Sequence, residues 1–379
     1  MPSLGGADAK DPPARANTEF PNYPTLPPRR WRLGASPPSD AVYGIATTNA
    51  FAQCARASRQ GVIRMRRKDL LDLQSLDAAE ITYLLDTAQS FKEIVTRPVK
   101  KVPTLRGKSV ATLFFEPSTR TRTSFEAAAK IMSADTYSLT GTTSSAVKGE
   151  SLKDTMLTLD AMGIDAFVIR HPLSGAANLA AEYVPDKPVI NAGDGTHEHP
   201  TQGLLDLLTI RQVKGRIEGL TVAIVGDILH SRVARSNIWG LAKMGARVRL
   251  IAPPTLLPAD AHLLPASVYT NLDAGLEGAD VVNILRIQLE RQDSAFFPSV
   301  REYARLFGVS KAKLENAAPD VTVLHPGPMN RGVEIASALA DDAEVAVITD
   351  QVTNGVAVRM AVLFWLMGAP PATELKNKL

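Results

Sequence analysis

From Leu76 onward, short apolar runs alternate with longer helical patterns, and this alternation restricts the fold more than any other feature of the sequence. β-Branched and apolar residues dominate the short runs, which is typical of strands buried in a parallel sheet. The longer segments repeat apolar residues every three or four positions, as helices that cover a sheet do. We therefore expect an α/β fold. The predicted strands are 109–115, 166–170, 221–225, 247–251, 280–285 and 322–325, and the predicted helices are 77–95, 124–133, 201–213, 232–244 and 352–367.

The alternating pattern is interrupted once, at residues 215–219, and a new strand-turn-helix unit begins at Thr221. We predict two domains, each a parallel sheet flanked by helices, at 65–205 and 206–350. Residues 351–379 are expected to form a C-terminal helix that packs back on the first domain. Because ligands of such sheets bind beyond the carboxyl ends of the strands, we expect an active site in the cleft between the domains.

Residues 1–64 differ from the rest of the chain. They hold 9 of the 26 prolines and show no sustained period of a helix or a strand. This composition is typical of a disordered extension, or of a start codon assigned too early. Met65 is the alternative first residue, because an amphipathic pattern begins directly after it. The four Asp and Glu residues of the segment disfavour a targeting peptide.

Charge and cysteine content exclude several classes of protein. The net charge is +3, but residues 1–64 alone carry 8 Lys and Arg against 4 Asp and Glu, so the remainder is close to neutral. A nucleic-acid-binding protein would need a basic face. The single cysteine, Cys54, excludes an intrachain disulfide framework and a cysteine-based zinc site, and it favours the cytoplasm. With no apolar run of 18 residues, we expect no membrane span.

The segment 118–124 reads Ser-Thr-Arg-Thr-Arg-Thr-Ser and lies between a predicted strand and an alanine-rich helix. The free N–H groups and the dipole at a helix N-terminus favour an anion. Hydroxyls of Ser118, Thr119 and Thr121 add donors, and Arg120 can bind phosphate oxygens in a bidentate pair. Simple N-capping, the alternative, needs only one hydroxyl. The segment therefore predicts an enzyme that acts on a small phosphorylated substrate.

Residues 114–122, Phe-Phe-Glu-Pro-Ser-Thr-Arg-Thr-Arg, resemble the carbamoyl-phosphate motif of the aspartate and ornithine carbamoyltransferase family. The resemblance covers about 65–367 and implies that Ser118, Thr119, Arg120 and Thr121 bind the phosphate of carbamoyl phosphate.

Three later residues match the family's contacts to the carbamoyl group, namely Arg170, His199 and Gln202. The resemblance implies that Arg170 and His199 polarise the carbonyl oxygen beside Thr121, where negative charge grows during attack. A structural helix cap is the alternative for His199. We interpret the other histidines near these motifs as structural; they are His171, His197 and His230.

The turn His325-Pro-Gly-Pro matches a further family segment, in which the backbone of Gly327 and Pro328 contacts the carbamoyl nitrogen. Ornithine enzymes resemble His-Cys-Leu-Pro here, whereas this chain has no cysteine at the turn. Glu116 and Pro117 before Ser118 are also similar to aspartate enzymes. Gly327 replaces the leucine or alanine of some members, but a backbone contact tolerates that change.

Residues 142–150 form a polar, glycine-containing segment suited to a closing loop. The resemblance implies that Lys148, with Ser144 or Ser145, enters the active site of a neighbouring subunit. It also implies a homotrimer, and some members bind regulatory chains or a dihydroorotase. A solvated surface loop is the alternative.

Arg232, Arg286 and Gln288 follow predicted strands of the second domain, and the resemblance implies that they bind L-aspartate together with Lys148. Two guanidinium groups suit a dicarboxylate. The expected reaction is carbamoyl transfer from carbamoyl phosphate to L-aspartate in pyrimidine synthesis, with catalysis by Arg120, Thr121, Lys148, Arg170 and His199 and without a metal or organic cofactor. Three alternatives remain: an ornithine enzyme, a catalytically silent scaffold, and a dinucleotide-binding oxidoreductase, although the turn after Val225 lacks Gly-x-Gly-x-x-Gly.

Overall fold

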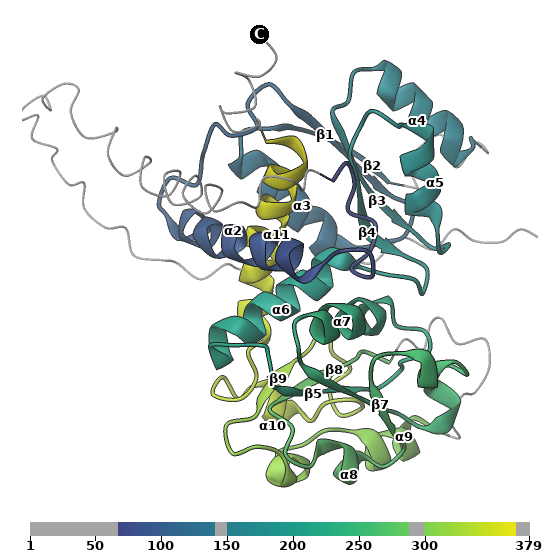
Figure 1. Cartoon of the computed structure of the whole chain (residues 1–379), viewed down its shortest axis with the longest axis vertical. Coiled ribbons are helices and arrows are strands. Elements are labelled where there is room, and N and C mark those ends of the chain that lie inside the picture. Colours follow the sequence, from purple (N-terminus) through teal and green to yellow (C-terminus); the bar gives the residue numbers. More distant parts are fainter. Residues whose placement is uncertain (1–66, 141–149, 288–298, 369–379) are drawn as a thin grey trace, which may run out of the picture. The chain divides into compact units, whose positions relative to one another are not determined.

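The computed structural model describes residues 67–140, 150–287 and 299–368. These ranges contain two parallel sheets, each flanked by helices, so the predicted fold class is confirmed (Figure 1). The N-terminal segment 1–64 lies outside the described residues. So do Met65, the alternative first residue, and four predicted site residues, Ser144, Ser145, Lys148 and Gln288.

The first sheet has four strands in the order β2-β1-β3-β4, all parallel. Helix α3 packs against β1 and β2, and α5 packs against β3 and β4. The inner strands are apolar because helices cover the sheet. The strands are β1 (Ser109–Phe114), β2 (Asp135–Thr140), β3 (Ala166–His171) and β4 (Val189–Asp194); the helices are α2 (Ala78–Thr96), α3 (Thr119–Ile131), α4 (Leu152–Ala161) and α5 (Ala176–Tyr183).

The second sheet has five parallel strands in the order β7-β6-β5-β8-β9. Helix α7 packs against β6, and α8 contacts β6 and β7. The strands are β5 (Thr221–Val225), β6 (Arg247–Ile251), β7 (Ser267–Tyr269), β8 (Val281–Ile284) and β9 (Thr322–Leu324); the helices are α7 (Arg232–Lys243), α8 (Leu272–Leu276), α9 (Val300–Phe307) and α10 (Ser337–Ala340).

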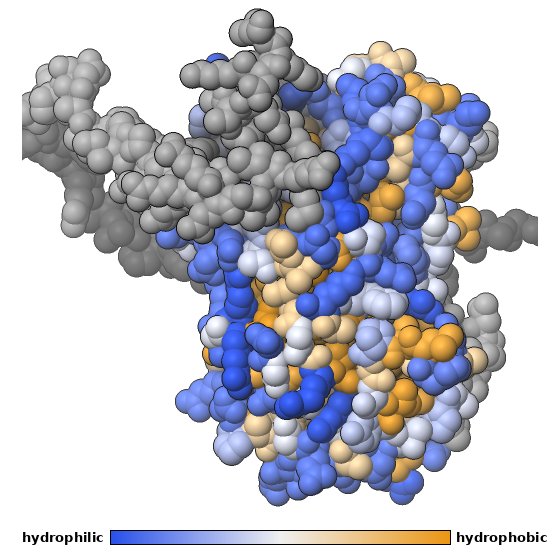
Figure 2. All heavy atoms as spheres, viewed as in Figure 1, coloured by the Kyte–Doolittle hydropathy of each residue, from blue (hydrophilic) through white to orange (hydrophobic). Residues whose placement is uncertain are grey.

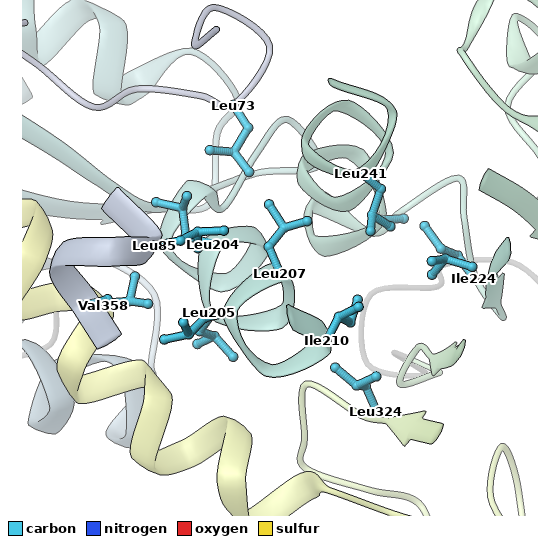
Figure 3. Packing of buried hydrophobic residues seen from close by; sticks show 14 of the residues in the cluster. Leu73, Leu85, Leu204, Leu205, Leu207, Ile210, Ile224, Leu241, Leu324 and Val358 are labelled. Carbon is cyan, nitrogen blue, oxygen red and sulfur yellow. The ribbon is translucent and has the colours of Figure 1, made fainter. Parts of the chain in front are cut away.

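Helix α6 (Pro200–Lys214) leads from the first sheet to the second, and its middle part is buried on all sides. It packs against α2, α7 and the last helix, α11 (Ile348–Met367), which in turn contacts α2 and α3. Figure 3 shows Leu205 on the side of Val358 from α11, and Ile210 on the side of Ile224 and Leu324 from the second sheet. These residues belong to one apolar core, so α6 holds elements of both sheets together.

Each predicted strand coincides with an observed strand, but β2, β4 and β7 were missed. Strand β2 is a polar edge strand with much of its surface exposed, and β7 is a three-residue edge strand, so neither carries a continuous apolar run. Strand β4 is buried but ends in Gly193 and Asp194, two residues that are common in loops, so its sequence does not read as a strand. Helix α3 begins at Thr119 rather than at residue 124, which puts the hydroxyl-rich segment in its first turn.

The face of the molecule in Figure 2 is largely hydrophilic, with hydrophobic residues scattered between the polar ones. Scattered exposed apolar residues are normal for a folded chain. Within residues 67–140, 150–287 and 299–368, no helix is long and apolar enough to cross a membrane.

Candidate active site

A cavity of about 700 Å³ lies beyond the carboxyl ends of β1, β3, β5, β8 and β9, and thus draws on both sheets. Every described residue that was assigned from the sequence to carbamoyl phosphate or aspartate lines it. These residues are Ser118, Thr119, Arg120, Thr121, Arg170, His199, Gln202, Arg232, Arg286, Gly327 and Pro328. Lys148 and Gln288 belong to the undescribed segments. His171, His197 and His230 are not among the lining residues.

The N-terminus of α3 is built differently from an ordinary capped helix. Ser118 occupies the N-cap position, yet its side chain makes no capping hydrogen bond. At α4, α7 and α9 the N-cap residues Ser151, Ser231 and Ser299 each accept a hydrogen bond from the first turn. Capping therefore does not account for Ser118. The first turn of α3 instead faces the cavity, in the arrangement that binds anions at helix N-termini.

Two glycines allow arginines to lie directly against the backbone. A β-carbon at Gly327 would come within 2.6 Å of Nη1 of Arg120, and one at Gly193 within 3.0 Å of Nε of Arg232. Both glycines have positive φ, 60° and 114°, which side chains rarely allow. Burial, and then the nearby charge of Arg286, lower the pKa of Arg120. Several guanidinium groups are thus packed around a single cavity.

Glu116 bridges two of these arginines. Its Oε1 atom accepts hydrogen bonds from Nη2 of Arg170 at 2.9 Å and from Nη2 of Arg232 at 2.6 Å. Arg170 lies near the end of β3 and Arg232 begins α7, so one carboxylate connects a strand of the first sheet to a helix of the second. In the sequence Glu116 stood out only as part of the motif, without a role of its own.

His199 is buried at the start of α6 and lines the cavity. It occupies the N-cap position but makes no side-chain capping bond, contrary to the structural alternative considered for it. Burial, followed by the charges of Arg170, Arg359 and Arg232, holds the pKa of His199 well below its ordinary value. The neutral imidazole is therefore the form favoured at neutral pH, and it can offer a hydrogen bond rather than a positive charge.

Arg359 is a lining residue that sequence reasoning missed. It lies on α11 and is only 3% exposed, and its Nη1 atom donates to Oγ of Ser124 at 3.1 Å and to the carbonyl of Gly355 at 2.9 Å. Its guanidinium group also lies over the ring of Phe125. Burial and the charge of Arg170 lower the pKa of Arg359 to about 9, which leaves it charged at neutral pH. No described carboxylate forms an ion pair with it.

The turn after β9 is fixed by buried hydrogen bonds. The N–H of Gly327 donates to Nδ1 of His325 at 2.8 Å, so Nε2 carries the ring proton and faces Glu334 at 3.2 Å. The N–H of His325 donates to Oε1 of Gln351 at 2.9 Å. The Gly327–Pro328 peptide is cis. These contacts hold the backbone of Gly327 and Pro328 at the cavity wall.

The described lining of the cavity is strongly positive. Its described charged residues are one glutamate and five arginines, namely Glu116, Arg120, Arg170, Arg232, Arg286 and Arg359. Such a surface attracts anions and repels cations. Among the described residues, no group of three or more His, Cys, Asp or Glu is arranged to hold a metal ion.

Comparison with known proteins identifies the family of this chain. The family model described as "Aspartate/ornithine carbamoyltransferase, carbamoyl-P binding domain" matches residues 68–212, and the corresponding Asp/Orn binding domain matches 218–366. The chain belongs to the aspartate/ornithine carbamoyltransferase family. The two family domains together cover both sheets and all the described residues predicted to line the site.

Individual members of the family are similar over most of their length. The aspartate carbamoyltransferase catalytic subunit of Heliobacterium modesticaldum is 62% identical over 303 residues, 80% of this chain and 96% of that protein. The aspartate transcarbamoylase of Trypanosoma cruzi, solved with N-(phosphonacetyl)-L-aspartic acid, is 31% identical with a TM-score of 0.74, covering 81% and 98% of the two chains. The ornithine carbamoyltransferase of Pyrococcus furiosus is 30% identical with a TM-score of 0.70, covering 79% and 97%.

Proposed function

We propose that this chain is an aspartate carbamoyltransferase. It transfers the carbamoyl group of carbamoyl phosphate to the amine of L-aspartate, and it releases N-carbamoyl-L-aspartate and phosphate in pyrimidine synthesis. The names of relatives such as the 62% identical Heliobacterium protein support this assignment.

The excess of arginine in the cavity is the observation that favours aspartate over ornithine as the acceptor. The fold alone does not discriminate, because aspartate and ornithine enzymes are similar to this chain at almost the same level. L-Aspartate brings two carboxylates, which Arg232 and Arg286 suit as bidentate partners. The side-chain ammonium of ornithine would instead enter a cavity whose described residues include five arginines and one glutamate. Like charges at close range disfavour that substrate.

Carbamoyl phosphate fits the other wall of the cavity. We assign its phosphate to the first turn of α3, with Ser118, Thr119, Arg120 and Thr121 as donors. The carbonyl oxygen lies toward Arg170 and His199, which donate hydrogen bonds as negative charge develops. We assign the carbamoyl nitrogen to the cis turn at Gly327 and Pro328 together with Gln202, which line the same cavity.

The reaction needs no covalent enzyme intermediate. The amine of aspartate attacks the carbamoyl carbon, a C–N bond forms, and the C–O bond to phosphate breaks. The proton lost by the amine is taken up by the leaving phosphate. Positioning of the two substrates supplies much of the rate, and Arg120, Arg170 and Lys148 stabilise the developing charge.

We further propose a cytoplasmic homotrimer in which Lys148 and a serine, Ser144 or Ser145, act in the site of a neighbouring subunit. Gln288 is assigned to aspartate binding. A regulatory chain or a dihydroorotase is a candidate additional partner, as in some members of the family.

One assay tests the proposed function directly. The purified full-length chain is incubated with carbamoyl phosphate and either L-aspartate or L-ornithine, and the carbamoylated product is measured. We expect product with aspartate only. Arg286→Ala should lose most activity at low aspartate, whereas Arg331→Ala, a matched arginine in an exposed ion pair with Asp341, should retain it.

Product with ornithine alone would assign the chain to the other branch of the family. A folded, assembled protein that is inactive with both acceptors would support the catalytically silent scaffold instead.

A further inference from the structure

A carboxylate lies at the centre of α6, where the apolar core would favour an aliphatic side chain. Asp206 is fully buried and accepts hydrogen bonds from four side-chain amides. Nε2 of Gln202 and Nε2 of Gln351 donate to Oδ1 at 3.0 and 2.8 Å. Nδ2 of Asn237 and Nδ2 of Asn283 approach Oδ2 at 2.7 and 3.4 Å. The four amides come from α6, α11, α7 and β8, so Asp206 connects elements of both sheets.

An ionised carboxylate can only accept hydrogen bonds, and this fixes the orientation of Gln202. The amide of a glutamine could otherwise turn either its NH₂ group or its oxygen toward a ligand. With NH₂ directed at Asp206, the oxygen Oε1 is the atom left for the cavity that Gln202 lines. Gln202 therefore offers the cavity a hydrogen-bond acceptor, to which a carbamoyl NH₂ group can donate.

Gln351, the second amide donor to Oδ1, connects Asp206 to the Gly327 turn of the same subsite. Gln351 donates its NH₂ group to Asp206, and its Oε1 accepts from the backbone N–H of His325. His325 in turn accepts from the N–H of Gly327. A single carboxylate oxygen thus orients Gln202 and, through two further hydrogen bonds, the Gly327 turn.

We propose that Asp206 is a positioning residue that makes the carbamoyl subsite selective for an amide NH₂ group over a methyl group of similar size. The proposal rests on the proposed function for the identity of the ligand. It assigns Asp206 an action through Gln202 and the Gly327 turn, without contact between Asp206 and substrate.

A purely structural role for Asp206 is the competing explanation. The two roles can be distinguished because the two carboxylate oxygens of Asp206 bind different partners. Among the described residues, Oδ2 serves Asn237 and Asn283, which do not line the cavity. Loss of a contact on this side should affect stability alone. Loss of acceptance at Oδ1 should change ligand selectivity, because a site built to hydrogen-bond an NH group discriminates against analogues that lack it.

Two hydrolysis-resistant ligands test the selectivity. Phosphonoacetamide keeps the carbamoyl NH₂ group, and 2-oxopropylphosphonate carries a methyl group in its place. Binding to the full-length protein is measured by calorimetry, so the test does not depend on turnover. We expect the wild type to prefer the amide by about tenfold or more, and Asp206→Leu to reduce this preference to about twofold. Affinity for inorganic phosphate should stay within about twofold.

A double-mutant cycle identifies the route of the effect. Gln202→Leu should lose much of the preference. Adding Asp206→Leu should then cause a smaller loss than it causes in the wild type, because the two substitutions share the Gln202 contact and only the Gly327 turn remains to be affected. Asn237→Ala is the matched control: it removes an amide from the same carboxylate, on the Oδ2 side, and should keep the preference while lowering the melting temperature.

An unchanged preference in folded Asp206→Leu, or additive losses in the double variant, would overturn the proposal. Should Asp206→Leu not fold, a structure of the wild type with phosphonoacetamide decides the matter. Gln202 must keep its contact with Asp206 while its oxygen accepts from the ligand NH₂, and a Gln202 turned away from Asp206 would contradict the assignment. A wild type that prefers phosphonoacetamide over 2-oxopropylphosphonate as expected, but fails to carbamoylate aspartate, would contradict the proposed function alone.

Discussion

Gly327 lies so close to Arg120 that a β-carbon at position 327 would come within 2.6 Å of Nη1 of the arginine. The glycine also has a φ of 60°, in the left-handed region. Position 327 therefore controls Arg120 sterically, in addition to the backbone contact that the family resemblance implies for it. The absence of a side chain lets the guanidinium group lie against the turn.

Replacing Gly327 with alanine should displace Arg120 and weaken phosphate binding. We expect the dissociation constant of inorganic phosphate to rise about three- to tenfold, which corresponds to roughly 1 kcal/mol. Gly332→Ala is a matched control, because Gly332 also has positive φ but a β-carbon there would meet no atom within 4 Å. Both variants should lose stability from backbone strain, and only Gly327→Ala should lose phosphate affinity. Equal phosphate binding in the two variants would contradict the steric argument.

The pKa of Arg359, lowered to about 9 by burial and by Arg170, predicts a pH dependence of anion binding. The guanidinium is charged below pH 9 and becomes neutral above it, so its attraction for an anion in the cavity fades as pH rises through 9. Arg359→Met should weaken binding of phosphonoacetamide several-fold at about pH 7.5, and the difference from wild type should shrink toward about pH 10. Calorimetric titrations across this range provide the measurement.

Arg331→Met is the control for this series, because Arg331 is exposed and lies outside the cavity. A constant ratio between wild type and Arg359→Met across the whole pH range would mean that Arg359 acts through packing against Phe125 rather than through its charge.

Burial raises the pKa of Asp206 from 3.8 to about 6, which gives stability a definite pH dependence. Between about pH 4 and 6 the folded protein holds a proton at this site that the unfolded chain does not. The contribution of Asp206 to stability therefore increases as pH falls from about 7 to about 4, by roughly 3 kcal/mol at most.

Asp206→Asn tests this linkage by removing the titration. The new amide fits the site, because Oδ1 of Asn237 and Oδ1 of Asn283 find no hydrogen-bond partner among the described residues. Thermal denaturation of both proteins should show that Asp206→Asn is stabilised relative to wild type most at about pH 7.5 and least at about pH 5. The opposite trend would mean that the four amides, rather than burial, dominate the ionisation of Asp206.

Residues in short local motifs could be predicted from sequence, whereas those defined by distant partners could not. Ser118 to Thr121 follow a predicted strand and begin a helix, so the rule for parallel sheets located them at the cavity. His199 was assigned through the family resemblance instead, because the strand that precedes it, β4, was missed. The bridge from Glu116 to Arg170 and Arg232 joins residues 54 and 116 positions apart, and no local pattern reports such a contact.

Arg359 and Asp206 nevertheless leave a signal in the sequence. Each is a lone charge in an apolar helical run, Leu-Leu-Asp-Leu-Leu in α6 and Val-Ala-Val-Arg-Met-Ala-Val in α11. A charge at a fully buried helical position is costly unless it has a partner or a ligand, so it marks a site. The sequence could nominate both residues in this way, but their partners required the packing of α6 against α7 and α11.

The proposed sharing of Lys148 between subunits predicts complementation between inactive chains. Arg120→Ala and Lys148→Ala should each abolish most activity as pure proteins, because each removes a positive charge from every site. In a mixed trimer, an interface that combines the intact Arg120 of one chain with the intact Lys148 of its neighbour contains a complete site. Mixing the two variants under conditions of subunit exchange should therefore restore a fraction of wild-type carbamoyl transfer. A double variant with both changes in one chain, mixed with wild type, controls for exchange. Absence of recovery despite demonstrated exchange would place Lys148 in the site of its own subunit.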